Sequence, residues 1–165
     1  MYPVRLGFTS ALKRIRRLSR NGHHAEALVT SVFTIEKTMR RVLRALVVSA
    51  GFPSIQTKVL MSKFDGLGRI KEVWECFDPK HEKLSAFASP GTLQTIAEAQ
   101  RMRNELVHGS KVFDLEHCKR ETEKALKALN NLRDTFQKRY GYDGWSKIRT
   151  RKKSALHSDP RVRIV

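Results

Sequence analysis

Hydrophobic side chains recur every three or four positions through most of the chain, which is the spacing of one face of an α-helix. The longest such stretch covers residues 25–50, and its apolar positions are Leu28, Val32, Ile35, Met39, Val42, Leu43 and Leu46. This spacing predicts one long amphipathic helix. We expect it to end at Gly51, a left-handed cap, before Pro53, which cannot continue a helix.

Three shorter helices are predicted after the long helix. The pattern predicts helices over residues 55–64 and 67–77, separated by the turn-forming sequence DGLG at 65–68. A second break, FASPGT, precedes a helix predicted to run over residues 93–108, with Thr92 as its cap.

The last predicted helix begins after Asp114, whose carboxylate suits an N-cap. Phe113 and Cys118 have the spacing of a hydrophobic staple around that cap, and the sequence RYGYDGW ends the helix. A heptad-like seam follows its length, made of Leu115, Cys118, Thr122, Ala125, Leu129, Leu132 and Phe136. We therefore expect it to pack lengthwise against the helix of residues 25–50.

No stretch alternates apolar and polar residues as a strand would, so the predicted fold is an all-α antiparallel helical bundle. The 165 residues suit one domain. We assign residues 1–144 to the bundle, with its core over 24–140, and residues 145–165 to a basic, flexible tail.

The charge is strongly positive, with 33 Lys and Arg against 16 Asp and Glu, a net charge of +17. Residues 1–20 hold six basic residues and no acid, and residues 145–165 hold seven basic residues and one acid. The 20 basic and 15 acidic residues of 21–144 leave only +5 there. Two basic ends on a nearly balanced body favour RNA or another nucleic acid as partner. The alternatives are a merely solvated surface or an anionic membrane, although the tail lacks the sustained apolar face that a membrane would require.

Other classes of protein fit less well. Cys76 and Cys118 form no CxxC pair, which is typical of a reducing, cytoplasmic location. The start of the chain lacks the apolar core of a signal peptide, and the longest apolar run, 45–52, falls far short of the roughly 20 residues that cross a bilayer. No P-loop, GxGxxG or HExxH motif is present, so we expect no cofactor and no metal.

The histidines and their neighbouring carboxylates do not have the pattern of a metal site. The pairs Glu105-x-x-His108 and Asp78-x-x-His81 are too few for a carboxylate-bridged di-iron site. His23 and His24 open the long helix, and we interpret them as surface residues, with a phosphate contact as the alternative.

One short stretch, RMRNELVHGS at 101–110, combines residue types that carry chemistry. On the predicted helix, Arg103 and Asn104 fall inside the apolar arc and His108 lies at its border, where Gly109 lets the helix stop. A guanidinium in an apolar arc is costly unless an anion or a hydrogen-bonding group meets it.

These three side chains suit cleavage of a ribose-phosphate link. Asn104 and His108 are four positions apart, so the amide can orient the imidazole, which titrates near neutrality and suits acid or base catalysis. Arg103 suits a phosphate. The structural alternative is that Arg103 pairs with a carboxylate such as Glu36 or Glu72 and ties two helices together.

The sequence Arg103-Asn104-x-x-x-His108 resembles the Arg-x4-6-His motif of the HEPN family (higher eukaryotes and prokaryotes nucleotide-binding), in which a polar residue often follows the arginine. Its place near the end of a helix, before a turn and a long last helix, is similar too. The likeness in architecture covers residues 24–140, and the match in residues is confined to 103–108.

This resemblance implies a metal-independent endoribonuclease that acts as a homodimer, with both motifs facing one cleft. Attack by a 2′-hydroxyl would leave a cyclic phosphate, with His108 as general base or acid, Arg103 as phosphate clamp and Asn104 as orienting residue. Many members are toxins of toxin–antitoxin or phage-defence systems, so an antitoxin or regulatory partner is implied, and others are inactive scaffolds. Ser110 stands where some of these toxins carry a tyrosine that a partner modifies.

The stretch of residues 142–153, which we call the C-terminal arm, places aromatic residues beside a basic run. This combination can stack bases and neutralise phosphates of single-stranded RNA. The predicted RNA-binding residues are Tyr142, Trp145, Lys147, Arg149, Arg151, Lys152 and Lys153. The alternative is that the aromatic residues dock the arm onto the body.

Two further functions stay open. One is a non-catalytic RNA- or ribosome-binding helical module. The other is a regulatory subunit that docks a nucleotide-handling enzyme through the apolar arc around Ile96.

Overall fold

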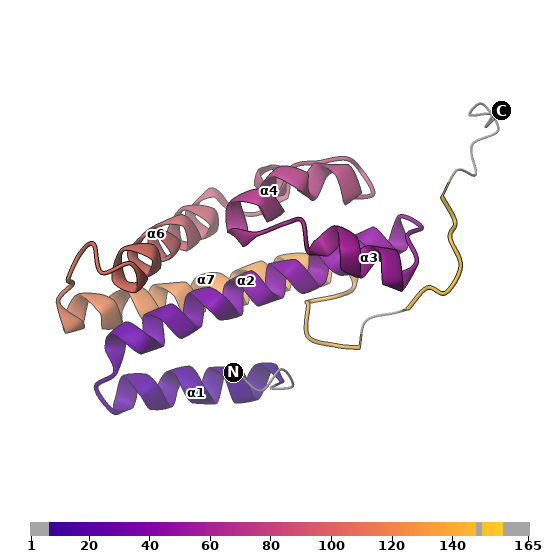
Figure 1. The fold of residues 1–165 in the computed structure, drawn as a ribbon. Helices are drawn as coiled ribbons and strands as arrows, with labels where there is room; N and C mark the ends of the chain where they lie inside the picture. Colours follow the sequence, from indigo (N-terminus) through magenta and orange to yellow (C-terminus); the bar gives the residue numbers. More distant parts are fainter. Residues whose placement is uncertain (1–6, 148–149, 157–165) are drawn as a thin grey trace.

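The computed structural model describes residues 7–147 and 150–156, which form seven helices and no strand (Figure 1). The helices are α1 (Phe8–Arg20), α2 (His24–Ser49), α3 (Ser54–Met61), α4 (Gly66–Phe77), α5 (Leu84–Phe87), α6 (Pro90–Val107) and α7 (Leu115–Tyr140). The predicted all-α fold is confirmed.

Helix α2 lies at the centre of the molecule and contacts α1, α3, α4, α6 and α7. It runs side by side with α7, as the seam along α7 predicted, while α4 and α6 lie on one side of this pair and α1 on the other (Figure 1). The core between them is apolar, and Trp74 of α4 stacks on Phe136 of α7 with ring centroids 5.2 Å apart. Burial of such large aromatic side chains is a main source of stability for a chain of this size.

The helix boundaries follow local chemistry. The Asp114 carboxylate accepts a hydrogen bond from the backbone N–H of His117 at 3.3 Å, which confirms the predicted cap of α7. Gly51, predicted to end α2, has a positive φ of 117°.

Two predicted boundaries are wrong. Helix α6 begins at Pro90, and the Ser89 hydroxyl, not Thr92, is its cap, accepting from the Thr92 N–H at 3.2 Å. The reason is that proline is favoured at the first position of a helix, where its missing N–H costs nothing. The predicted turn between two helices exists, but it lies at residues 62–65, because α3 ends at Met61 and α4 already begins at Gly66, the first glycine of DGLG.

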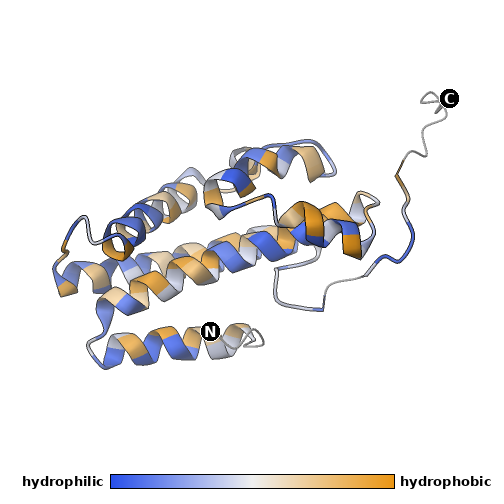
Figure 2. Cartoon of the chain, in the orientation of Figure 1, coloured by the Kyte–Doolittle hydropathy of each residue, from blue (hydrophilic) through white to orange (hydrophobic). Residues whose placement is uncertain are grey.

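Helix α1 was not predicted, because basic residues dominate the first part of the chain. Its apolar residues Phe8, Leu12 and Ile15 nevertheless have helical spacing, and hydrophobic and hydrophilic positions alternate along it in Figure 2. Ile15 is fully buried, and Phe8 and Leu12 pack against the core. The described part of the N-terminal basic end is therefore an amphipathic helix attached to α2.

Residues 145–147, which we expected to begin a flexible tail, lie against α2. Trp145 donates a hydrogen bond from its indole nitrogen to the Thr38 hydroxyl at 2.9 Å. Arg41 donates to the carbonyl of Gly144 and, at 3.3 Å, to that of Ser146. We call residues 141–147 the C-terminal strap, because they attach the end of α7 to the side of α2.

Residues 150–156 continue along the end of α2 and the start of α3. The Ser54 N–H donates to the Arg151 carbonyl at 2.9 Å, and Arg151 Nε donates to the Val48 carbonyl at 3.0 Å. A third bond joins the Ala155 N–H to the Gly51 carbonyl at 2.9 Å. This stretch is therefore bonded to the body, and the rest of the predicted tail lies outside the described residues.

No helix in the described part of the chain is both long enough and apolar enough to span a bilayer.

Candidate functional site

The C-terminal end of α6 places His108 at the surface. The Ser110 N–H donates to the Glu105 carbonyl at 3.0 Å, and the Gly109 N–H donates to the Leu106 carbonyl at 3.3 Å. These two bonds form a Schellman motif, which needs a left-handed residue after the cap, and Gly109 supplies it with a φ of 64°. His108 is the cap residue itself, and its side chain is exposed. The motif thus fixes the backbone of His108 while leaving its imidazole accessible.

Arg103 lies five positions before His108 and is held between α6 and α2. Its guanidinium lies over the Phe33 ring, with Cζ 4.7 Å from the ring centroid. Nη1 donates to the Asn104 amide oxygen at 2.9 Å, and Nη2 donates to Glu36 Oε2 at 3.3 Å. The side chain is only 18% exposed, and its Nε is buried without a hydrogen-bond partner.

The ion pair with Glu36 is one of the two structural alternatives that the sequence left open for Arg103. The other carboxylate considered, Glu72, pairs with Arg69 at 2.8 Å instead. Glu36 also has a second partner, Arg40, at 3.4 Å. One carboxylate therefore serves two guanidiniums, which leaves the cluster of Glu36, Arg40 and Arg103 with a net positive charge.

Asn104 bonds to Arg103 in the structure. Its amide oxygen accepts from Arg103, and no hydrogen bond joins its side chain to the imidazole of His108. The geometry therefore makes Asn104 a direct support for the arginine.

The apolar arc predicted for this helix is displaced. The buried residues of α6 are Thr92, Ile96, Ala99 and Met102, whereas Asn104, which we expected inside the arc, is only partly buried. The shift arises because α6 packs against both α7 and α2, so its buried stripe faces the space between them. Arg103 falls within the direction of this buried stripe, with 18% of its side chain exposed, and His108 lies well outside it. Ile96 is only 2% exposed, so it cannot form the centre of a docking surface.

Four exposed apolar side chains belong to the end of α6, to the loop and the first residue of α7 that follow it, and to the neighbouring helix α2. They are Phe33 at 43% exposure, Val107 at 54%, Val112 at 93% and Leu115 at 54%. Val107 follows Arg103 by one turn on the same face of the helix, and Val112 lies in the loop between α6 and α7. We call these four residues the α6–α7 patch. Large apolar side chains gathered at one place are typical of an interaction surface.

The predicted RNA-binding residues of the C-terminal arm divide into two groups. Tyr142 and Trp145 are partly buried in the strap, and Lys37 lies 5.0 Å from the centroid of the Trp145 ring. Arg151 is engaged by its bond to α2. The lysines Lys147, Lys152 and Lys153 are exposed, while Arg149 lies outside the described residues. The aromatic residues dock the arm to the body, which is the alternative stated for them, and the lysines stay available to an anion.

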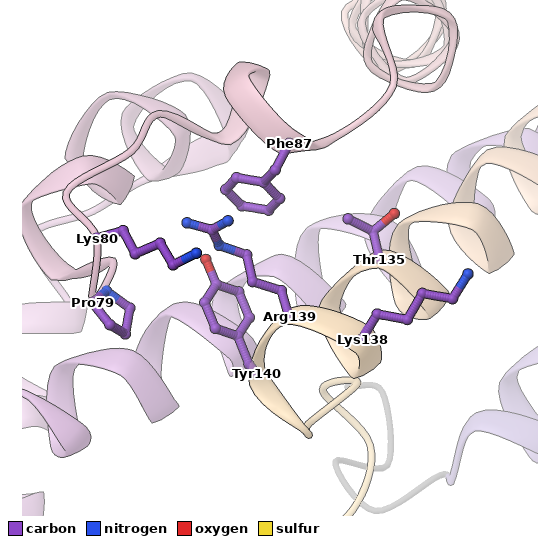
Figure 3. Close-up of a pocket in the computed structure, with 7 residues that line it drawn as sticks. All are labelled: Pro79, Lys80, Phe87, Thr135, Lys138, Arg139 and Tyr140. Carbon is purple, nitrogen blue, oxygen red and sulfur yellow. The ribbon is translucent and has the colours of Figure 1, made fainter.

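A second polar cluster, around Asp78, was missed by the sequence reasoning. Asp78 is buried after the end of α4 and is bonded by Arg139 at 3.0 and 2.9 Å and by the Tyr140 hydroxyl at 2.5 Å. Figure 3 shows the Arg139 guanidinium between the Phe87 ring and Tyr140. No local signal could have revealed this cluster, because Asp78 and Arg139 are 61 positions apart.

The electrostatics of this cluster are those of a satisfied ion pair. Burial opposes the ionisation of Asp78, but hydrogen bonds from Arg139 and Tyr140 outweigh it and lower the pKa of Asp78. Burial and the bond to Asp78 raise the pKa of Tyr140 to about 12. Arg139 is also bonded to Glu82 at 2.6 Å. Because its donors are occupied by two carboxylates, we interpret the cluster as a structural joint between α4, α5 and α7.

Among the described residues, no group of three or more His, Cys, Asp or Glu side chains could hold a metal ion.

Comparison with known proteins identifies no relative, since no family model, no curated protein and no solved structure matches the chain.

Proposed function

We propose that the protein is a metal-independent endoribonuclease of the HEPN type that acts as a homodimer. The observation that carries the proposal is that an exposed imidazole, His108, and a largely buried guanidinium, Arg103, lie five positions apart at the end of the same helix. Their directions on the helix differ by about 140°, so the long arginine side chain must reach toward a ligand held at His108. The imidazole is accessible to a substrate, and the guanidinium has one donor, the buried Nε, that no acceptor of the described residues satisfies.

The proposed reaction needs only these groups. His108 accepts the proton of a ribose 2′-hydroxyl, and the oxygen attacks the adjacent phosphorus while the bond to the 5′-oxygen breaks. The leaving oxygen takes a proton from a protonated imidazole, either the same one or that of the second copy. The products are a 2′,3′-cyclic phosphate and a 5′-hydroxyl.

Arg103 would stabilise the negative charge that develops on the phosphate oxygens. In the structure it is paired with Glu36, so it must exchange part of that contact for the phosphate. Glu36 keeps Arg40 as a partner when this happens. The exchange therefore leaves no carboxylate without a counter-charge, which lowers its cost.

The α6–α7 patch supports the proposed dimer. Phe33 contacts Arg103 and Val107 directly precedes His108, so a second copy docked on this patch would bring its own motif close to the first. Burial of apolar side chains from two copies supplies the free energy that a stable interface needs.

A toxin role in a toxin–antitoxin or phage-defence system belongs to the same proposal. Ser110 lacks the phenol that partners of some HEPN toxins modify, so silencing by that modification is not part of the proposal.

The test is an RNA cleavage assay with EDTA present, comparing His108→Ala with wild type. We expect His108→Ala to lose activity by at least about 100-fold, the usual worth of an acid–base group. Wild-type products should carry cyclic phosphate ends, which acid treatment opens.

The matched control is His117→Ala. His117 lies near the start of α7 and contacts the Phe113 ring, with centroids 5.9 Å apart, but is not part of the motif. It should keep wild-type activity. Near-normal cleavage by His108→Ala would remove His108 from the mechanism.

The second candidate is a non-catalytic RNA-binding module, which the ion pair between Arg103 and Glu36 favours. In that case Arg103 ties α6 to α2 and has no role in chemistry. The wild-type protein would then bind RNA and leave it intact in the same assay.

A further inference from the structure

A groove of about 580 Å³ lies between α1 and α7 and is separate from the site at the end of α6. Arg16 and Arg20 line it from α1, His24 from the start of α2, and Lys119 and Glu123 from α7. Cations therefore occur on both walls, with a single acid among the lining residues.

Four cations of α1 differ from many arginines elsewhere in the chain because they have no partner among the described residues. Lys13, Arg16, Arg17 and Arg20 are exposed, and α1 contains no acidic residue. Within the described residues, none of these four side chains makes an ion pair or hydrogen bond. By contrast, many arginines of the bundle pair with carboxylates, among them Arg40, Arg69, Arg101, Arg103, Arg133 and Arg139.

Unpaired, exposed arginines suit an external anion. Their charge is not offset by an internal acid, so they generate a positive potential and gain most from releasing the counterions of a polyanion. Lys119 adds to this potential, because its contact with the exposed Glu116 is long, at 3.9 Å.

The shape of this surface favours a nucleic acid over a membrane. The apolar side of α1 faces inward, with Ile15 fully buried, so the helix has no apolar face to insert among lipids. A groove with cations on two walls fits a flexible chain of phosphates, as in proteins that bind single strands.

The groove also lies at the appropriate end of the bundle. The turn between α1 and α2 and the loop between α6 and α7, which follows His108, are at the same end of the molecule (Figure 1). A strand lying in the groove could continue around this end toward the site.

We infer that the groove between α1 and α7 binds the phosphate backbone of single-stranded RNA and delivers the strand to the site at His108. The choice of RNA rests on the proposed function, whereas the binding surface itself rests on the groove and its two unpaired arginines, Arg16 and Arg20.

The experiment compares two double variants in a His108→Ala background, so that RNA is bound without being cut. Arg16→Gln with Arg20→Gln removes two charges from the groove. Arg69→Gln with Arg101→Gln removes two exposed arginines elsewhere that pair with carboxylates. Glutamine has nearly the helix propensity of arginine, so the helices should be preserved, which circular dichroism checks.

Binding of a fluorescent polyuridine oligonucleotide is measured by anisotropy across a range of salt concentrations. Loss of two phosphate contacts should reduce the slope of log K against log salt by about 1.4 and weaken binding by about 25-fold at 0.1 M salt. The Arg69 and Arg101 variant should change binding by less than about twofold, since the total charge is lowered equally but outside the groove.

A single substitution tests the same surface in the opposite direction. Glu123→Gln removes the one acid among the residues that line the groove and should tighten binding by about threefold. The matched control, Glu98→Gln on α6, should have no such effect.

Equal losses of RNA affinity in the two double variants would overturn the inference, because the effect would then depend on the total charge of the protein and not on the groove. The inference would also be overturned if the Arg16 and Arg20 variant bound RNA normally but no longer bound phosphatidylserine vesicles. That result would mean that the cations of α1 contact a membrane. Intact RNA with wild-type protein, but the expected loss of binding in the groove variant, would refute the nuclease and leave the groove in place.

Discussion

At the scale of single residues, the buried carboxylate of Asp78 is closely compensated. Asp78 has a side chain with no exposed surface, and it is bonded by Arg139, by Tyr140 and by the backbone N–H groups of Lys80 and Glu82. Removal of one member of such a cluster leaves its partners buried without compensation, which costs more than the cluster itself contributes.

We therefore expect Asp78→Asn to lower the free energy of unfolding by about 3 kcal/mol near neutral pH. Urea denaturation followed by circular dichroism measures the loss. Asp134→Asn on the exposed side of α7 is the control and should change stability by less than about 0.5 kcal/mol. A change of that small size for Asp78→Asn would show that the cluster is not a structural joint.

The same residue predicts a dependence on pH. Because the pKa of Asp78 is lowered by folding, its contribution is complete above the unfolded pKa of about 3.9 and is lost as the pH falls toward the folded value. Wild-type stability should decline below about pH 4 more steeply than that of Asp78→Asn. Parallel declines would mean that Asp78 is not the group responsible.

At the scale of elements, the C-terminal strap depends on a close approach between two backbones. Gly144 has a φ of 93°, and a Cβ placed on it would lie 3.0 Å from the Thr38 carbonyl oxygen. Both features oppose any larger residue at this position, while the neighbouring Trp145 anchors the strap to α2.

Gly144→Ala should therefore destabilise the protein by about 2 kcal/mol. Gly68→Ala is the matched control, since Gly68 is helical and a Cβ added there meets nothing within 4 Å. It should be neutral or stabilise the protein by up to about 1 kcal/mol. Thermal denaturation of the two variants measures the difference, and equal midpoints would show that the strap contributes little to the fold.

At the scale of the whole molecule, the proposed dimer makes a prediction about the α6–α7 patch. A glutamate at Val107 would place a charge in the middle of an apolar interface beside Arg103, and we expect Val107→Glu to weaken the dimer by at least about 100-fold. Sedimentation velocity over a range of concentrations measures the association.

The matched control is Ile55→Glu. Ile55 is 82% exposed but lies on α3, away from the patch, so this variant should remain dimeric. A wild-type protein that stays monomeric at every concentration would refute the dimer, and dissociation by both variants would place the interface elsewhere.

The sequence by itself determined the elements that carry a regular apolar pattern and a clear cap. Residues 25–50 and the last helix were predicted nearly to their ends, because periodicity and capping act between residues a few positions apart. The exposed position of His108 follows from Gly109 for the same local reason.

Only the tertiary structure decided which groups meet across helices. It selected Glu36 over Glu72 as the partner of Arg103, joined Asp78 to Arg139, and turned the basic N-terminal stretch into a packed helix. Each outcome depends on how far one helix is shifted and rotated against another. That arrangement is set by the packing of the entire core, so a local stretch of sequence does not contain it.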